Sequence, residues 1–327
     1  MSADRIRWGI AATGRIANAF AAGLAELDDA ETVAVASRAI DRADAFGEKF
    51  GIAHRHGSYE ALAADPDVDV VYVATPHSRH EVDTLLFLEA GKHVLCEKPF
   101  ALNVEQAQRM VDAARSRGRF LMEAIWSRFL PSYVELRRLL DAKVIGEPLV
   151  VESAFGFRAE MDPANRLFDL ALGGGALLDL GIYTLQLVSL VLGPPVGVRA
   201  VARVGETGAD EQVAAVLSHA GGGMGVVTAA TRVGLAGTAR ISGSEGSITL
   251  PTPMHYAQSL TVATADGVEV IDAPVVGSGL AYQAVEVHRC LREGLHESPT
   301  MPLAETLTLA STMDRIRAQI GVRYPGE

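Results

Sequence analysis

The stretch Ile6-Arg7-Trp8-Gly9-Ile10-Ala11-Ala12-Thr13-Gly14-Arg15-Ile16-Ala17 decides the fold of the first part of this chain. Its first half is an apolar run typical of a strand, and its second half turns into an alanine-rich helix that we expect to reach about residue 27. Aligned on the pattern G-x-G-x-x-G, the segment keeps only Gly14, the glycine that lets backbone approach a pyrophosphate. Alanine stands at the other two positions. The motif is weak by itself, because any strand, turn and helix can contain one glycine.

A second apolar strand, residues 32–37, strengthens the dinucleotide-binding interpretation. It ends about where the ribose-reading strand of such a fold should end, and Arg38 follows it in place of an acid. An acid there would bind the ribose 2′-hydroxyl, whereas the Ser37 hydroxyl and the Arg38 guanidinium suit a 2′-phosphate. The sequence therefore favours NADP, with NAD as the alternative. A solvated side chain near the next helix is the other interpretation of Arg38.

Strand-like and helical segments continue to alternate up to residue 124. Residues 68–74 are almost continuously apolar, which is typical of a parallel strand covered on both faces. The alternation, with short turns, predicts a doubly wound parallel sheet. Right-handed crossovers would place the turns that follow the strands along one edge, where ligands bind in such sheets. These turns come after Ala11, Ser37, Ala74 and Cys96.

The run His93-Val94-Leu95-Cys96-Glu97-Lys98-Pro99-Phe100 ends in a lysine held between an acid and a proline. Pro99 lacks an amide hydrogen and disfavours helical geometry at Lys98, so we expect the lysine in an extended or turn conformation just past a strand. A charged group there is well placed for chemistry in an open α/β sheet. The alternative is a surface lysine after an edge strand.

After residue 124 the pattern changes to strands separated by turn signals. Several strand-like runs follow one another between residues 196 and 271, divided by the glycine-containing segments 221–223, 244–246 and 265–267. Helices over 280–293 and 303–320 close the chain. We therefore predict an N-terminal Rossmann-type domain, residues 1–124, with a doubly wound parallel sheet. The second domain, residues 125–327, is of the α+β class, with a mostly antiparallel open sheet flanked by helices, and its last helix could pack back on the first domain.

One apolar helix of the second domain carries two polar groups. It opens with Gly173-Gly174-Gly175, which would let a ligand or another backbone approach closely. Asp179 and Tyr183 are four residues apart and so share one helix face among apolar neighbours. A buried carboxylate invites a cation, and Lys98 is the candidate. In the alternative interpretation, Asp179 caps a loop and Tyr183 packs in the core.

Composition excludes several classes of protein. The chain has 327 residues with 49% hydrophobic and 21% charged, which suits two packed globular domains. A net charge of −11 with interspersed signs argues against nucleic-acid binding. Without an apolar leader or a membrane span, we expect a soluble cytoplasmic protein. The distant cysteines, Cys96 and Cys290, are expected to be buried free thiols, and no metal site is predicted.

Taken together, these motifs resemble the Gfo/Idh/MocA family, which includes glucose-fructose oxidoreductase and inositol dehydrogenase. The most specific stretches are Glu97-Lys98-Pro99 and the segment from Gly174 to Tyr183, supported by Thr75-Pro76-His77-Ser78-Arg79-His80. Many members carry histidine where this chain has Tyr183. The tyrosine, together with the stretch from Met122 to Phe129, is similar to the subgroup of dimeric dihydrodiol dehydrogenases and NADP-linked D-xylose dehydrogenases.

The resemblance implies reversible hydride transfer between NADP and the hydroxyl-bearing or carbonyl carbon of a sugar or cyclic diol. Lys98, Asp179 and Tyr183 correspond to the family's catalytic residues, and we expect Tyr183 to be the base. Family members associate through the C-terminal sheet, so a homodimer or homotetramer is implied. The expected substrate-binding residues are Trp126, Arg128, Phe155, Arg166, Asp179 and Tyr183. The expected cofactor-binding residues are Ala12, Thr13, Gly14, Arg15, Ile16, Ser37, Arg38, Thr75, Pro76, His77, His80, Glu97 and Lys98.

Two alternatives to this function stay open from the sequence. The same residues could serve a reductase of keto-sugars, including nucleotide-linked ones, working in the opposite direction. A protein of another class, an NADP-binding sensor or regulatory subunit without turnover, would need the cofactor site alone. The intact set of Lys98, Asp179 and Tyr183 argues against the sensor.

Overall fold

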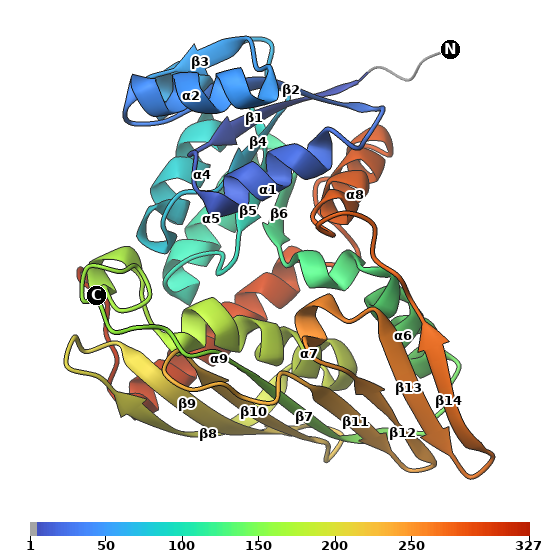
Figure 1. The fold of residues 1–327 in the computed structure, drawn as a ribbon. Coiled ribbons are helices and arrows are strands. Elements are labelled where there is room, and N and C mark those ends of the chain that lie inside the picture. The colour runs from blue at the N-terminus through green and yellow to red at the C-terminus, as the bar shows by residue number, and fades with distance from the viewer. Residues whose placement is uncertain (1–4) are drawn as a thin grey trace. The chain divides into compact units, whose positions relative to one another are not determined.

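The computed structural model describes residues 5–327, and the chain divides into two compact units. The first unit consists of the residues up to Ala101 together with Glu105–Trp126 and Val276–Thr306. The second consists of Leu102–Val104, Ser127–Val275 and Leu307–Glu327. From the sequence, residues 125–327 were expected to form one domain whose last helix could pack back on the first. The contacts instead group residues 276–306, which include the predicted helix over 280–293, with the first unit, and residues 307–327 with the second. Figure 1 shows the elements of both units.

The first unit contains a six-stranded sheet in the order β3-β2-β1-β4-β5-β6, with all neighbours parallel. The order reverses between β1 and β4, so the predicted doubly wound sheet is confirmed. The short strand β3 and the short helix α3 were not predicted. The strands are β1 Ile6–Ala11, β2 Ala30–Ala36, β3 His54–His56, β4 Val70–Val73, β5 His93–Glu97 and β6 Leu121–Ala124. The helices are α1 Arg15–Leu24, α2 Ile40–Phe50, α3 Tyr59–Ala63, α4 His80–Glu89, α5 Val104–Arg117 and α8 Ala281–Arg292.

A buried polar relay explains why α8 joins the first unit. The indole nitrogen of Trp8, a fully buried residue of β1, donates to Nε2 of His288 on α8 at 2.9 Å. The other ring nitrogen of His288 lies 3.1 Å from the carboxylate of Asp29. Helix α1 approaches α8 so closely that a Cβ on Gly23 would lie 3.3 Å from the backbone nitrogen of Ala281. These contacts join residues that are far apart in the sequence, and no local pattern predicted them.

The second unit contains an eight-stranded sheet in the order β14-β13-β12-β11-β7-β10-β9-β8. Only β7 and β10 pair in parallel, and the three predicted hairpin turns join β9 to β10, β11 to β12 and β13 to β14. The mostly antiparallel open sheet is therefore confirmed. The strands are β7 Pro148–Gly156, β8 Pro195–Val204, β9 Asp210–His219, β10 Met224–Ala230, β11 Ala239–Gly243, β12 Gly246–Leu250, β13 Ser259–Thr264 and β14 Gly267–Asp272.

Helices lie over one face of this sheet, and among the described residues no helix covers the opposite face (Figure 1). They are α6 Pro131–Asp141, α7 Ile182–Leu192 and α9 Leu303–Ile320. Helix α7 packs on β7 and β10, and Gln319 of α9 bonds to the backbone of β8. The segment Leu170–Leu192 is long and apolar enough to cross a membrane, but 83% of its most apolar window is buried in the protein. Its position in the core accounts for that apolar character.

A buried carboxylate on β9 holds the start of the helix that carries Asp179 and Tyr183. Asp210 accepts a hydrogen bond from the amide of Leu177 at 2.7 Å, and its side chain has almost no contact with solvent. Burial raises the pKa of Asp210 to about 7, although the hydrogen bond from the Leu177 amide opposes the shift. The phenol of Tyr324 donates to the carbonyl of Gly174 at 2.9 Å in the same region. Neither Asp210 nor Tyr324 was predicted from the sequence.

The raised pKa of Asp210 predicts a pH-dependent stability that Asp210→Asn removes. An acid whose folded-state pKa is raised stabilises the fold most at low pH, and this contribution is lost as the pH rises through the folded-state value. Asparagine still accepts the Leu177 amide but carries no charge. From pH 5 to pH 8, the free energy of unfolding of the wild type should therefore fall by roughly 2–3 kcal/mol relative to that of the variant.

Urea denaturation of both proteins at the two pH values, followed by circular dichroism, measures this difference. Other titrating groups are common to the two proteins and cancel in the comparison. A stability difference of the same size at pH 5 and pH 8 would show that Asp210 is ionised throughout this range.

Candidate active site

The loop between β1 and α1 keeps the shape of a glycine fingerprint although alanine replaces two of its glycines. Ala12 has a φ of 93°, a conformation that usually requires glycine. Gly14 precedes α1 in an extended conformation, and a Cβ built on it meets no protein atom within 4 Å. Ala17, at the third position, is fully buried against the sheet. The protein itself therefore leaves room at Gly14, which fits a cofactor phosphate close to the amino end of the helix.

Two polar side chains hold this loop in place. The side-chain nitrogen Nδ2 of Asn18 donates to the carbonyls of Thr13 and Gly14 at 3.2 and 3.0 Å. Lys49 of α2 in turn donates to the Asn18 oxygen at 2.8 Å. Neither residue was predicted, because a polar residue in the first turn of a helix gives no sign of its partners. Two further predicted contacts, Arg15 and Ile16, occupy the first turn of α1.

The ends of β2 and β3 lie side by side at the predicted ribose site. The amide of Ser37 donates to the carbonyl of His56 at 3.1 Å, and the side chain of Arg38 is exposed. Burial raises the pKa of the nearby phenol of Tyr59, while the charges of Arg38 and Arg79 act to lower it. Arg79 forms an ion pair with Asp83 at 2.6 Å. Arg38 is therefore the better placed of the two arginines to contact a 2′-phosphate.

Buried carboxylates fix the loop that carries Lys98. Glu97 accepts hydrogen bonds from the phenol of Tyr72 and from the amide of Lys98, the second at 3.1 Å. Glu123, which follows in β6, accepts the amide of Phe100 at 3.0 Å. Glu97 was predicted to bind the cofactor, and its side chain is instead turned into the protein. Lys98 itself is partly exposed at the carboxyl end of β5.

His80 connects the loop after β4 with the loop after β5. The imidazole is fully buried, and its two nitrogens lie 2.8 Å from the carbonyl oxygen of Pro99 and 2.9 Å from that of Thr75. Burial lowers the pKa of His80 in spite of these carbonyls. Both ring nitrogens thus contact backbone carbonyls within the protein, and the ring joins two loops of the predicted cofactor-binding edge. His77 is also buried and packs edge-on against His80, while Pro76 is partly exposed.

In the second unit, the glycine cluster serves the packing of the backbone. A Cβ on Gly174 would lie 2.8 Å from the carbonyl oxygen of Arg166 and 2.9 Å from backbone atoms of Asp169. Gly173 and Gly175 both have positive φ values, of 80° and 131°. Of the two predicted reasons for these glycines, close approach of another backbone is therefore the one that the structure supports.

The helix after the glycines begins with a π-helical turn, Leu177–Gly181 (η4), before continuing as α7. Such turns are rare and are often found at functional sites. Asp179 lies within the turn, almost completely buried, and forms a two-pronged ion pair with Arg166 at 3.1 and 3.3 Å. The Arg166 side chain is half exposed. Arg166, predicted only as a substrate contact, therefore supplies a cation for this carboxylate.

Tyr183 stands in an aromatic cluster. Its ring centre lies 5.7 Å from that of Phe155 in an edge-to-face arrangement and 5.0 Å from the ring centre of His255. Phe155 and His255 pack together at 4.3 Å. His255 was not predicted, because it lies on a short 3-10 helix, Met254–Tyr256, far from Tyr183 in sequence. The Tyr183 ring is therefore packed against one phenyl ring and one imidazole, and the residue is 6% exposed.

The two remaining predicted substrate contacts are both buried. Arg128 is completely inaccessible, and its guanidinium donates to the side chain and the carbonyl of Gln186 at 2.9 and 2.8 Å. These bonds make Arg128 a support of α7 instead of a group that faces substrate. Trp126 is 9% exposed and begins a 3-10 helix, Trp126–Phe129.

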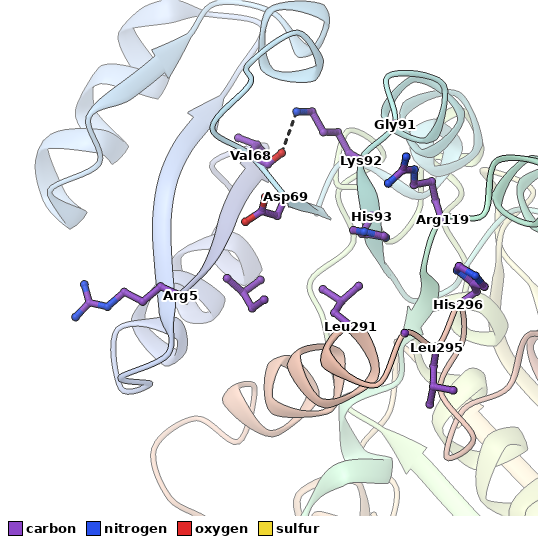
Figure 2. A pocket seen from close by; sticks show the side chains of 12 residues that line it. Arg5, Val68, Asp69, Gly91, Lys92, His93, Arg119, Leu291, Leu295 and His296 are labelled. Atoms are coloured by element: carbon purple, nitrogen blue, oxygen red, sulfur yellow. Dashed lines mark hydrogen bonds between the residues drawn. The ribbon is translucent and has the colours of Figure 1, made fainter. Parts of the chain in front are cut away.

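A pocket of about 430 Å³ opens in the first unit at the amino ends of its strands (Figure 2). Its walls include Asp69 before β4, His93 at the start of β5 and Arg119 before β6. Lys92 crosses it to donate to the carbonyl of Val68 at 2.9 Å. Gly14 and Lys98 follow the opposite ends of their strands, so this pocket is separate from the predicted cofactor edge.

Both predicted cysteine thiols are buried and free. Cys96 lies at the end of β5, directly before Glu97, and burial raises the pKa of its thiol well above the usual value. A thiol in this state is a poor nucleophile. The candidate chemistry in this region therefore rests with Lys98.

The chain is similar over its full length to proteins named trans-1,2-dihydrobenzene-1,2-diol dehydrogenase. The Mus musculus protein is 42% identical and the Homo sapiens protein 41% identical, and each alignment covers 98% of both chains. Among solved structures, a 3-ketoreductase from Actinomadura kijaniata in complex with NADP and TDP-benzene has a TM-score of 0.88 at 28% identity, covering 97% of this chain and 98% of that one. An aldose-aldose oxidoreductase from Caulobacter crescentus, complexed with glycerol, has a TM-score of 0.89 at 27% identity, covering 96% and 97%.

Two family descriptions match successive parts of the chain. Residues 6–125 match the oxidoreductase family with an NAD-binding Rossmann fold, and residues 133–249 match the GFO/IDH/MocA C-terminal domain. The first range contains all six strands of the parallel sheet, and the second contains the strands from β7 to β11 and most of β12. The resemblance predicted from the sequence motifs is confirmed, and the chain belongs to the Gfo/Idh/MocA family of oxidoreductases.

Proposed function

We propose that this protein is an NADP-dependent dehydrogenase that oxidises a hydroxyl-bearing carbon of a cyclic diol or sugar. The observation that carries the proposal is the full-length similarity, at 41–42% identity, to the trans-1,2-dihydrobenzene-1,2-diol dehydrogenases. The candidate residues Lys98, Asp179 and Tyr183 are all present. A small-molecule substrate is in keeping with these relatives.

The proposed mechanism divides the work among three side chains. When bound, NADP supplies the nicotinamide carbon that accepts or returns the hydride. Tyr183 takes the proton of the substrate hydroxyl during oxidation and gives it back during reduction. A free phenol has a pKa of about 10 and is a weak base at neutral pH, so we assign to Lys98 the positive charge that favours the phenolate. Asp179, held by Arg166, orients the substrate hydroxyls.

The choice of NADP is supported by the ends of β1 and β2. The space at Gly14 accepts a phosphate, and exposed Arg38 follows Ser37 where an acid would select NAD. The 3-ketoreductase structures hold NADP.

A keto-sugar reductase is the second candidate, because the similar 3-ketoreductase was solved with a nucleotide-linked ligand. Its identity to this chain, 28%, is well below the 41–42% of the diol dehydrogenases. Assays of turnover of trans-diols and aldoses with NADP, and of keto-sugars with NADPH, would distinguish the dehydrogenase from the reductase. Binding of NADP without turnover of any of them would favour the sensor interpretation.

We also propose a homo-oligomer formed through the open face of the eight-stranded sheet, in a cytoplasmic protein. The strand register places five apolar side chains on that face with 44–73% of their surface exposed. An apolar face of this kind on a soluble protein favours association with a second copy. The five residues are Val201, Val216, Met224, Val268 and Val270.

Replacing Tyr183 by phenylalanine tests the proposed base. Because only the hydroxyl is lost, we expect kcat for diol oxidation to fall by about 10²–10⁴ while the Kd for NADP stays within about twofold. Lys98→Met should also lose turnover and keep NADP affinity. Tyr282→Phe, a tyrosine of α8 remote in sequence, serves as the control. Near-wild-type kcat in the Tyr183 variant would move the proton transfer to another group.

Gly14→Ala tests the cofactor approach. The added methyl group meets no protein atom, and the backbone conformation of Gly14 is open to alanine, so the melting temperature should change little. The Kd for NADP, measured by cofactor fluorescence, should rise by about tenfold or more because the backbone can no longer approach a phosphate. Unchanged affinity would place the phosphates elsewhere.

Arg38→Ala tests cofactor selection. Removing the guanidinium should weaken NADP by roughly 10–100-fold, the loss of one charge-assisted phosphate contact. The Kd for NAD, which lacks the 2′-phosphate, should stay within about twofold. Equal losses for both cofactors would indicate a general effect on the loop.

Val270→Glu tests the oligomer. Val270 lies opposite Thr261 on the open face, so a carboxylate there has no basic partner in register. Burying it in a sheet-to-sheet contact is strongly unfavourable, so the variant should shift towards monomer. Size-exclusion chromatography with light scattering gives the mass in solution. Val82→Glu, an exposed valine of α4, is the matched control. A monomeric wild type would contradict the proposal outright.

A further inference from the structure

Three side chains with metal-ligand atoms meet at the β3 edge of the first unit. His54 and His56 stand two residues apart on β3, so their side chains leave the same face of the strand. Asp65, just after α3, reaches both: its Oδ2 lies 2.7 Å from Nδ1 of His54 and 2.9 Å from Nε2 of His56. All the ligand atoms lie within 4.8 Å of one another.

Asp67 bonds to one of these side chains and lies close to a second. The amide of Asp67 donates to Oδ1 of Asp65 at 3.0 Å, which fixes the carboxylate with Oδ2 towards the histidines. The carboxylate of Asp67 lies 4.0 Å from Nε2 of His54, the ring nitrogen that does not face Asp65. Carboxylates and amides in these positions are the usual supports of metal-binding histidines and aspartates.

The charges around the cluster are compatible with a cation. Lys92 donates to the backbone carbonyl of Asp65 at 2.5 Å, whereas the Asp65 carboxylate faces the two histidines. The guanidinium of Arg7 pairs with Asp67 at 3.1 Å and with Asp69 at 2.7 Å. The side chains of His54 and His56 are 39% and 23% exposed, which gives an ion and its water ligands access. The rings meet at 78°, with both facing nitrogens directed at one oxygen.

We propose that His54, His56 and Asp65 bind one divalent transition-metal ion, zinc or a close analogue such as cobalt. Two imidazole nitrogens and one carboxylate oxygen suit these ions, whereas magnesium and calcium prefer oxygen ligands alone. To bind the ion, each ring must present an unprotonated nitrogen to it and carry its proton on the other nitrogen. Solvent completes the coordination.

The ion would brace the edge of the sheet. It joins the three-residue strand β3 to the segment after α3, and the carbonyl of His56 already accepts the amide of Ser37. We therefore assign it a stabilising task next to the predicted ribose site. The inference uses residues of the first unit only and does not depend on the proposed function.

Zinc titration of the tag-free full-length protein, after dialysis against EDTA, tests the site. Competition with a chromophoric chelator should give one zinc ion per chain. His54→Gln and His56→Gln should each raise the Kd at least tenfold, while His296→Gln, which removes an exposed histidine of the same unit, should leave it unchanged. Equal zinc affinity in all four proteins, or a wild-type Kd weaker than about 100 µM, would overturn the proposal.

Two measurements on the wild type keep the test decisive if a variant misfolds. Cobalt bound at the site should give visible absorption bands that zinc displaces in a 1:1 ratio. Saturating zinc should raise the melting temperature of the EDTA-treated protein, as expected for a ligand that binds only the folded state. If cobalt gave no visible bands and zinc did not raise the melting temperature, the proposal would be contradicted.

Discussion

Hydrogen bonds from backbone amides to buried carboxylates fix the loop that carries Lys98, the predicted catalytic residue of the first unit. Glu97 accepts the amide of Lys98, and Glu123 accepts the amide of Phe100, at 3.1 and 3.0 Å. Both carboxylates are almost completely buried. Because a buried amide and a buried carboxylate are each costly without a partner, the loop is stable in the one conformation that joins them. The backbone of Lys98 is thereby positioned before any substrate binds.

The same interaction organises the second unit. Asp210 accepts the amide of Leu177 at the start of the helix that carries Asp179 and Tyr183. The π-helical turn that follows sets the orientation of Asp179, and Arg166 fixes its carboxylate from outside. Side chains held in this way would lose little freedom on binding a substrate, which suits the catalytic role predicted for Asp179 and Tyr183.

The glycines show how differently two similar motifs are constrained. At Gly14 the protein leaves open space, and Ala12 takes a backbone conformation that usually requires glycine, so the loop is shaped for a ligand. At Gly174 the neighbouring backbone already fills the space. A glycine in the sequence does not reveal which of these two demands applies, since both the ligand and the neighbouring chain are distant in sequence.

The sequence by itself determined the elements and their order. Apolar periodicity and turn residues are local, so nearly every strand and long helix, the two sheet types and the motifs around Lys98 and Tyr183 could be predicted. Tertiary structure alone decided the partners: Arg166 for Asp179, His255 beside Tyr183, and the grouping of residues 276–306 with the first unit. These contacts join positions from 13 to 280 residues apart, and no local pattern encodes which distant side chain will satisfy a buried charge or fill the space beside a ring.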